Sequence, residues 1–278
     1  AALLTYFGQV QRDVTVEPAI VFTGESQTAI TVNGGETVFS KDLLVESKTS
    51  VLVPLSIDTT HSPNNGGITH TVNYLLSSTG SVGDSNENRI FIRAEDTLVT
   101  TLSDLTSISW DVDGTGYIAH VDVFLDNGEV LVFEYAKVKT PFDEKPYPEG
   151  SLNTFGIRGI VDNAAGAWIS SGCAGEPYMV WYTLSDWKSG KTGTITKCDG
   201  TSDKTYNIIG STGVIGFEIE TDNWIIDSES EVSNILINGN PVEVSLKPSD
   251  SLEFNVETEF STLNVGTYTV TTTVEPRA

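Results

Sequence analysis

The residues whose types and spacing come closest to a metal site lie between positions 111 and 122. The run Asp-Val-Asp-Gly-Thr-Gly-Tyr-Ile-Ala-His-Val-Asp has oxygen-bearing side chains at its first, third, fifth and twelfth positions and glycine at its sixth. Calcium loops have this order, because calcium is held by several oxygen ligands around a sharp turn. The predicted ligands are Asp111, Asp113, Thr115 and Asp122.

The same run departs from a calcium loop in its ligands and in its surroundings. Threonine stands at the fifth position, the last acid is aspartate where the longer glutamate is usual, and the flanking residues alternate as strands do. An ordinary β-turn rich in aspartate and glycine has a similar composition. Calcium binding and a plain turn therefore both fit the sequence.

Motifs for catalysis are missing from the sequence. The three histidines, His61, His70 and His120, stand in no His-Glu-x-x-His arrangement, and the chain contains no Gly-x-Ser-x-Gly and no Walker-type loop. The 38 acidic residues offer many possible pairs for glycoside hydrolysis, but this abundance makes no single pair informative. We therefore expect a protein that is not an enzyme.

The charge of the chain restricts its partners. Fifteen basic residues stand against 38 acidic ones, a formal net charge of −23. Nucleic acids and anionic membranes attract basic surfaces, so neither is an expected partner. No run of apolar residues approaches the length of a membrane span. Copies this acidic repel one another, so self-association would need apolar burial, salt or bridging cations.

The first 22 residues alternate with the period of a β-strand from the first position, and the chain begins without methionine. This start predicts a secreted, extracellular protein whose signal peptide has been removed. Residues 2–7 are apolar on both faces, and such a strand needs a groove in which both faces are covered. The groove belongs either to the chain's own sheet or to a neighbouring copy, by strand addition.

The two cysteines, Cys173 and Cys198, are an even pair. In an extracellular protein they can close one disulfide, which would stabilise the fold by about 3–4 kcal/mol. Two buried, reduced thiols are the alternative.

Most of the remaining chain reads as short strands separated by turn residues. Asn33-Gly34 and Asp126–Glu129 predict hairpins, Asn238-Gly239 predicts a turn, and residues 97–105 predict a single helical turn. The class is therefore all-β, most simply a sandwich. The expected strands cover residues 14–22, 29–32, 37–39, 43–46, 51–57, 68–76, 90–94, 108–112, 117–125, 130–138, 214–220, 235–237, 242–246, 252–256 and 268–274.

A different composition begins at a cluster of three prolines after residue 140, and residues 141–210 are rich in glycine and aromatic side chains. We interpret 13–140 and 211–278 as the sandwich core and 141–210 as an irregular insertion or subdomain. Four tryptophans, three of them in this segment, could form a sugar-stacking platform or part of the core. The residues concerned are Trp168, Trp181, Trp187 and Trp224.

Both ends of the chain resemble one family. The opening Ala-Leu-Leu-Thr-Tyr-Phe-Gly-Gln-Val-(x)₃-Val-Thr-Val-Glu-Pro-Ala-Ile and the closing Leu-Glu-Phe-Asn-Val-Glu-Thr-Glu-Phe-(x)₅-Gly-Thr-Tyr-Thr-Val-Thr-Thr-Thr-Val-Glu-Pro are similar to secreted archaeal proteins of the TasA/camelysin type. Archaeal bundling pili and similar extracellular threads and tubules belong to this type. The middle of the chain, above all residues 141–210, carries no part of the resemblance.

The resemblance implies a jelly-roll-like sandwich whose N-terminal strand, residues 1–12, completes the sheet of the next copy. It implies a homopolymeric extracellular filament for adhesion, cell–cell connection or biofilm. The alternative is a monomeric secreted sandwich that binds carbohydrate or calcium at the cell surface. In the filament, the side chains that would fill the acceptor groove are Leu3, Leu4, Tyr6, Phe7 and Val10.

Overall fold

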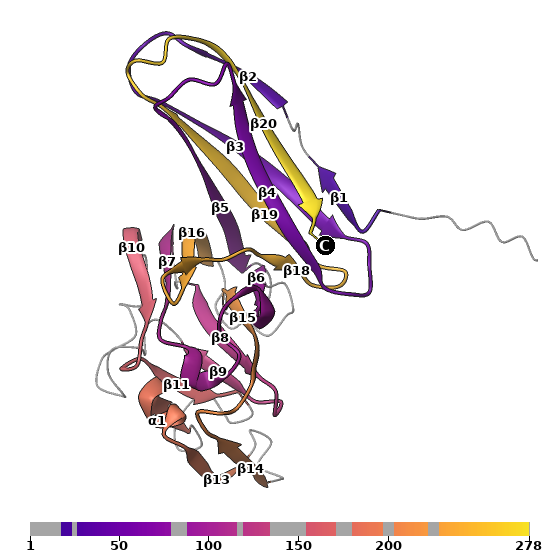
Figure 1. Ribbon diagram of the computed structural model, residues 1–278, viewed down its shortest axis with the longest axis vertical. Coiled ribbons are helices and arrows are strands. Elements are labelled where there is room, and N and C mark those ends of the chain that lie inside the picture. The colour runs from indigo at the N-terminus through magenta and orange to yellow at the C-terminus, as the bar shows by residue number, and fades with distance from the viewer. Residues whose placement is uncertain are drawn as a thin grey trace, which may run out of the picture.

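The protein is built from two large antiparallel sheets packed as a sandwich, with a short helix and a separate hairpin at one end (Figure 1). This confirms the predicted all-β sandwich. The computed structural model describes residues 18–23, 27–78, 88–115, 119–133, 154–170, 180–196, 203–221 and 228–277.

Sheet 1 has eight described strands, and among these the short β17 (Asn240–Pro241) pairs only with β16. The other seven follow one another across the sheet in the order β1 (Ile20–Thr23), β3 (Thr37–Ser47), β19 (Ser251–Phe260), β5 (Ile68–Ser78), β16 (Ser228–Ile237), β7 (Ile108–Thr115) and β10 (Thr154–Val161).

Sheet 2 has ten strands and lies against sheet 1. Its order is β12 (Trp181–Thr183), β11 (Gly166–Ile169), β9 (Val130–Phe133), β8 (His120–Leu125), β15 (Val214–Glu220), β6 (Arg89–Arg93), β18 (Ser245–Leu246), β4 (Val53–Ser62), β20 (Gly266–Pro276) and β2 (Gln27–Val32).

Three smaller groups of elements complete the described structure. Helix α1 (Leu184–Lys188) follows β12, and Thr183 caps it by accepting from the main-chain N–H of Asp186. The strands β13 (Lys191–Thr196) and β14 (Asp203–Ile208) pair only with each other. The 3₁₀ turns η1 (Ala94–Asp96) and η2 (Leu102–Asp104) link β6 to β7, and η2 lies within the predicted helical turn.

The chain crosses between the two sheets at most of its turns. The Asp126–Glu129 turn forms the predicted hairpin, β8–β9. The predicted Asn238-Gly239 turn joins β16 to its partner β17, and each of the two turns has a glycine with positive φ. The hairpin predicted at Asn33-Gly34 is wrong. There β2 pairs with β20 of sheet 2 while β3 pairs with β1 and β19 of sheet 1, so this turn joins the two layers.

The core fills the space between the sheets because apolar side chains alternate with polar ones along strands such as β19 and β20 and along most of β8. On β8, for example, Val121, Val123 and Leu125 point inward and are buried. A second, smaller apolar cluster lies at the far end of the long strands, around Phe260 and Tyr268. The two clusters make the sandwich elongated along β3, β4, β19 and β20 (Figure 1).

The predicted insertion, residues 141–210, contributes edge strands to both sheets, β10 to sheet 1 and β11 with β12 to sheet 2. Trp187 is fully buried in the core against Tyr182 and Tyr206, so it cannot stack on a sugar. Trp168 and Trp181 are half-buried partners across β11 and β12, and Trp224 lies outside the described residues.

Candidate functional site

One edge of sheet 1 is only half covered. Strand β3 pairs with β19 over residues 37–46, but on its other side β1 covers only residues 44–47. Among the described residues, 37–43 therefore have a strand partner on one side only. The exposed main-chain groups of such an edge can pair with a strand from elsewhere.

Burial along β3 changes where β1 ends. The inward-facing side chains next to β1, Leu43 and Val45, are 4% and 0% exposed. Those beyond it, including Phe39 and Lys41, are only half-buried, although Phe39 packs against the second apolar cluster. The inner surface of the sandwich is therefore incompletely covered beside residues 37–41.

The facing edge of sheet 2 is half covered in the complementary way. Strand β2 pairs with β20 over residues 266–271, and residues 272–276 of β20 pair only with β4 among the described strands. β1 thus covers one end of the sandwich edge on sheet 1, and β2 covers the other end on sheet 2 (Figure 1). The open stretch of sheet 1, residues 37–43, lies opposite β2 of sheet 2. The open stretch of sheet 2, residues 272–276, lies opposite β1 of sheet 1.

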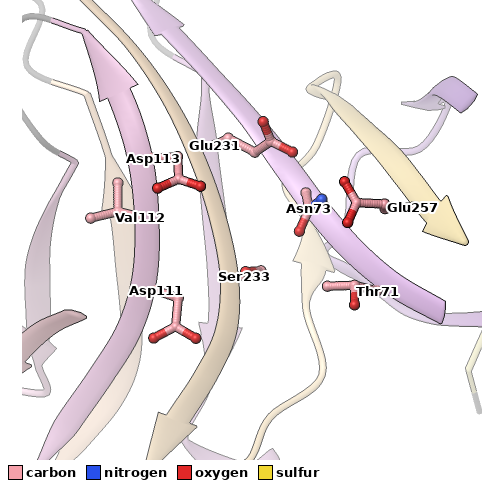
Figure 2. Close-up of a pocket in the computed structure, with 8 residues that line it drawn as sticks. All are labelled: Thr71, Asn73, Asp111, Val112, Asp113, Glu231, Ser233 and Glu257. Atoms are coloured by element: carbon pink, nitrogen blue, oxygen red, sulfur yellow. The ribbon is translucent and has the colours of Figure 1, made fainter. Parts of the chain in front are cut away.

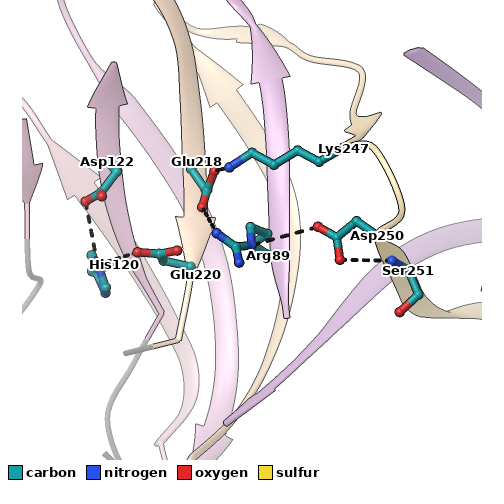
Figure 3. Close-up of polar contacts among 8 residues, drawn as sticks. All are labelled: Arg89, His120, Asp122, Glu218, Glu220, Lys247, Asp250 and Ser251. Carbon is teal, nitrogen blue, oxygen red and sulfur yellow. Dashed lines mark hydrogen bonds and ion pairs between the residues drawn. The ribbon is translucent and has the colours of Figure 1, made fainter. Parts of the chain in front are cut away.

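A buried ionic cluster lies on the outer face of sheet 2. The register places Glu220 opposite His120 and Glu218 opposite Asp122 on the neighbouring strands β15 and β8. All four alternate with core residues and so share the outward face. Their side chains are nevertheless only 2–14% exposed. Figure 3 shows the cluster together with the residues that contact it.

The ionic contacts of the cluster fall into two groups. Nε2 of His120 lies 3.6 Å from Oδ1 of Asp122 and 3.4 Å from Oε1 of Glu220. Glu218 forms ion pairs with Arg89, at 3.1 Å, and with Lys247. Arg89 also lies 3.8 Å from the carboxylate of Asp250, as Figure 3 shows.

The two glutamates have different affinities for protons. Burial raises the pKa of Glu218 to about 7, and the neighbouring Glu220 acts in the same direction while Lys247 opposes it. Burial would also raise the pKa of Glu220, but the hydrogen bond and the charge of His120 lower it to about 2. The pair therefore holds its negative charge on Glu220, next to His120.

A second group of acids surrounds a pocket of about 450 Å³ on the outer face of sheet 1 (Figure 2). The Glu231 carboxylate accepts a hydrogen bond from Asn255, which in turn accepts one from Asn73. Burial and then repulsion from Glu259, Glu231 and Asp113 raise the pKa of Glu257. The lining residues are Thr71, Asn73, Asp111, Val112, Asp113, Glu231, Ser233 and Glu257.

Two histidines meet between the sheets, His61 on β4 and His70 on β5. Nδ1 of His61 lies 2.9 Å from Nε2 of His70, whose Nδ1 lies 2.9 Å from the hydroxyl of Thr258. Nε2 of His61 lies 3.1 Å from the main-chain oxygen of Asn65, which can only accept, so this nitrogen carries the proton. If both rings are neutral, the assignment consistent with these contacts has Thr258 donating to His70 and His70 donating to His61.

The structure separates the predicted calcium ligands. Asp111 and Asp113 lie on β7 in sheet 1, whereas Asp122 lies on β8 in sheet 2 next to His120. The carboxylate of Asp111 accepts hydrogen bonds from the guanidinium of Arg158, at 2.6 Å, and from the side-chain amide of Asn234, at 2.8 Å. The backbone of Thr115 belongs to β7, and its side chain lies outside the described residues. The run is therefore a strand and a crossing between layers, not one loop.

The other predicted site residues also lie outside the described residues. These are the donor-strand residues Leu3, Leu4, Tyr6, Phe7 and Val10 and the cysteines Cys173 and Cys198. Sequence reasoning missed His120, Glu218 and Glu220 as a group. The only local signal is the alternation of ionisable with apolar residues in His-Val-Asp-Val and Phe-Glu-Ile-Glu, which many exposed strands share.

No protein-family model, curated protein or solved structure matches this chain. Within the described ranges, no helix is long and apolar enough to cross a membrane.

Proposed function

We propose that the protein is a structural subunit of an extracellular filament, in which residues 1–12 of one copy add a strand to the sandwich of the next. The observation that carries the proposal is the half-covered edge of β3, where Phe39 is incompletely buried and residues 37–43 lack a second strand partner within the described part of the chain. An apolar strand supplied from outside would complete both the ladder and the core.

The position of β1 favours a donor from another copy. β1 begins with Ile20 opposite Ser47, and the described residues before it lie beyond the Ser47 end, where the oxygen of Ala19 accepts from the main-chain N–H of Lys48. The open stretch is at the Thr37 end, with β1 in between. The chain's own N-terminal residues would have to reverse direction and pass β1 to reach it. A strand from a second copy has no such obstacle.

The dimensions and the symmetry are also consistent with assembly. Seven strand residues span about 24 Å, and a donor of twelve residues is longer than this. The donor and its acceptor edge are different surfaces of the subunit, so each contact leaves a free donor and a free edge for the next copy. Such an arrangement extends head to tail. A filament of this kind would serve adhesion, cell–cell connection or biofilm.

Electron microscopy of the full chain beside a variant that lacks residues 1–12 tests the proposal. We expect filaments from the full chain and single particles from the truncated one. Moderate salt should favour assembly because it screens the repulsion between copies that carry a net charge of −23. Single particles from both chains would overturn the proposal and leave the alternative, a monomeric sandwich that binds carbohydrate or calcium.

A peptide of residues 1–12 tests the acceptor edge directly. It should bind the truncated chain with one-to-one stoichiometry, and a scrambled peptide should not. Phe39→Ala should weaken this binding at least tenfold because the inward side chain of β3 contacts the donor. Val38→Ala is the matched control, since Val38 is the next residue on the same strand and points outward, 59% exposed. Equal loss in both variants would place the peptide elsewhere.

A further inference from the structure

The histidine side of the buried cluster has the geometry of a metal site. One imidazole nitrogen and one oxygen from each of two carboxylates lie within 4.8 Å of one another in His120, Asp122 and Glu220. The distances from Nε2 of His120, 3.6 and 3.4 Å, are close to the separation of about 3.4 Å between ligands that lie about 2.1 Å from a tetrahedral metal ion. Only small side-chain movements would be needed to admit an ion.

The strands hold these three ligands in place. Glu220 and His120 are direct partners in the β15–β8 ladder, and Asp122 follows two residues along the same face of β8. Their side chains are 14%, 8% and 12% exposed, so few other conformations are open to them. A site whose ligands are already positioned by sheet structure loses little entropy on binding.

The balance of charge also favours a divalent cation. The ion pairs that Arg89 and Lys247 form in Figure 3 are with Glu218, which is not one of the three ligands. Two carboxylates and a neutral imidazole carry two negative charges, which a divalent ion would balance.

The ligand types select the class of metal. We infer that His120, Asp122 and Glu220 form a binding site for a first-row transition-metal ion such as Zn²⁺ or Mn²⁺. Imidazole suits such ions, and one histidine with two carboxylates gives three protein ligands and leaves a position for water. Calcium prefers six to eight oxygen ligands and gains little from imidazole. This inference does not rest on filament assembly.

Calorimetric titration of the full chain, stripped with chelator and exchanged into chelator-free buffer, tests the site with Zn²⁺, Mn²⁺ and Ca²⁺ in turn. We expect one Zn²⁺ or Mn²⁺ per chain, bound at least tenfold more tightly than Ca²⁺. Glu220→Gln and Asp122→Asn should each weaken transition-metal binding at least tenfold. Asp113→Asn is the matched control, because it removes the same charge from the outer face of the other sheet and should leave affinity unchanged.

Two further measurements distinguish an ion held at His120 from an ion held elsewhere on the chain. His70→Gln removes one member of the His61–His70 pair and should leave the stoichiometry at one if the ion is held at His120. Melting curves in chelator show whether Glu220→Gln still folds, and Zn²⁺ should raise the melting temperature of the wild type but not of this variant. Absence of Zn²⁺ and Mn²⁺ binding, tighter binding of Ca²⁺, or equal weakening by Asp113→Asn would overturn the inference.

Discussion

The outer faces of the two sheets both carry rows of acids on their central strands, but the two rows have different surroundings. On sheet 1 the acids are half-buried or exposed around an open pocket (Figure 2). On sheet 2 they are buried and contact histidine, arginine and lysine (Figure 3). The acids compared are Asp113, Glu231 and Glu257 on sheet 1 and Asp122, Glu218 and Glu220 on sheet 2.

The comparison shows that burial, not residue type, decides what a row of acids does. Exposed carboxylates repel one another weakly because water and salt screen them. Buried carboxylates must be neutralised by a proton, a cationic side chain or a metal ion. On sheet 2, Glu218 has a raised affinity for a proton and two cationic partners, Arg89 and Lys247. The group around His120 has the geometry for a metal ion.

Removing one acid from the outer face of each sheet should give the largest difference in the loss of stability. Glu218→Ala leaves Arg89 and Lys247 without their shared partner in a poorly solvated place, and we expect a loss of about 2–4 kcal/mol in the free energy of unfolding at about pH 8. Glu231→Ala, the matched change on sheet 1, should cost less than about 1 kcal/mol. Urea denaturation of both variants measures the difference. Similar losses would mean that burial does not separate the two faces.

The fold was largely predictable because period-two patterns report which residues face a core. The strands around Val121 and around Phe217 follow this rule, and the Asp126–Glu129 turn formed its hairpin. The pairing of strands was less predictable. Asn33-Gly34 reverses the chain as expected, but a turn says nothing about which sheet the next strand will join, since that depends on partners such as β19 and β20 far along the sequence.

The buried cluster was not predictable for a related reason. Alternation indicates that His120 and Asp122 face away from the core, and an outward face is normally solvated. Nothing in the local sequence shows that this face is buried, or that Glu218 and Glu220 lie opposite on a strand nearly a hundred residues later. The predicted calcium ligands are separated because the first and last of them lie on strands of different sheets, which their spacing along the chain does not show.

The pH dependence of stability should differ between wild type and Glu218→Gln. Burial raises the pKa of Glu218 to about 7 in the folded state, so the folded protein keeps a proton that the unfolded chain releases above about pH 4.5. This stabilising contribution is complete below the unfolded pKa and is lost as pH rises through about 7. Relative to the glutamine variant, wild type should therefore lose stability between about pH 5 and pH 8.

The difference in stability between wild type and Glu218→Gln separates the contribution of Glu218 from that of the His61–His70 pair. Burial and the neighbouring His61 lower the pKa of His70, so its contribution has the opposite sign and is lost as pH falls below about 6.5. Because wild type and Glu218→Gln share this contribution, it cancels. Denaturation midpoints at a series of pH values provide the measurement, and parallel curves would contradict the raised pKa of Glu218.

The smallest expected effect is a gain in stability when an acid is removed from the outer face of sheet 1. Glu257 is repelled by Glu259, Glu231 and Asp113, so Glu257→Gln should raise the free energy of unfolding by about 0.3 kcal/mol at low salt. Asp111→Asn on the same face should instead lower it by about 0.5 kcal/mol, because that carboxylate pairs with a guanidinium at 2.6 Å. Both effects should vanish at about 1 M salt, where charges are screened within about 3 Å. Denaturation at two salt concentrations measures them, and a salt-independent loss in Glu257→Gln would show that this acid stabilises the sheet through packing and not through charge.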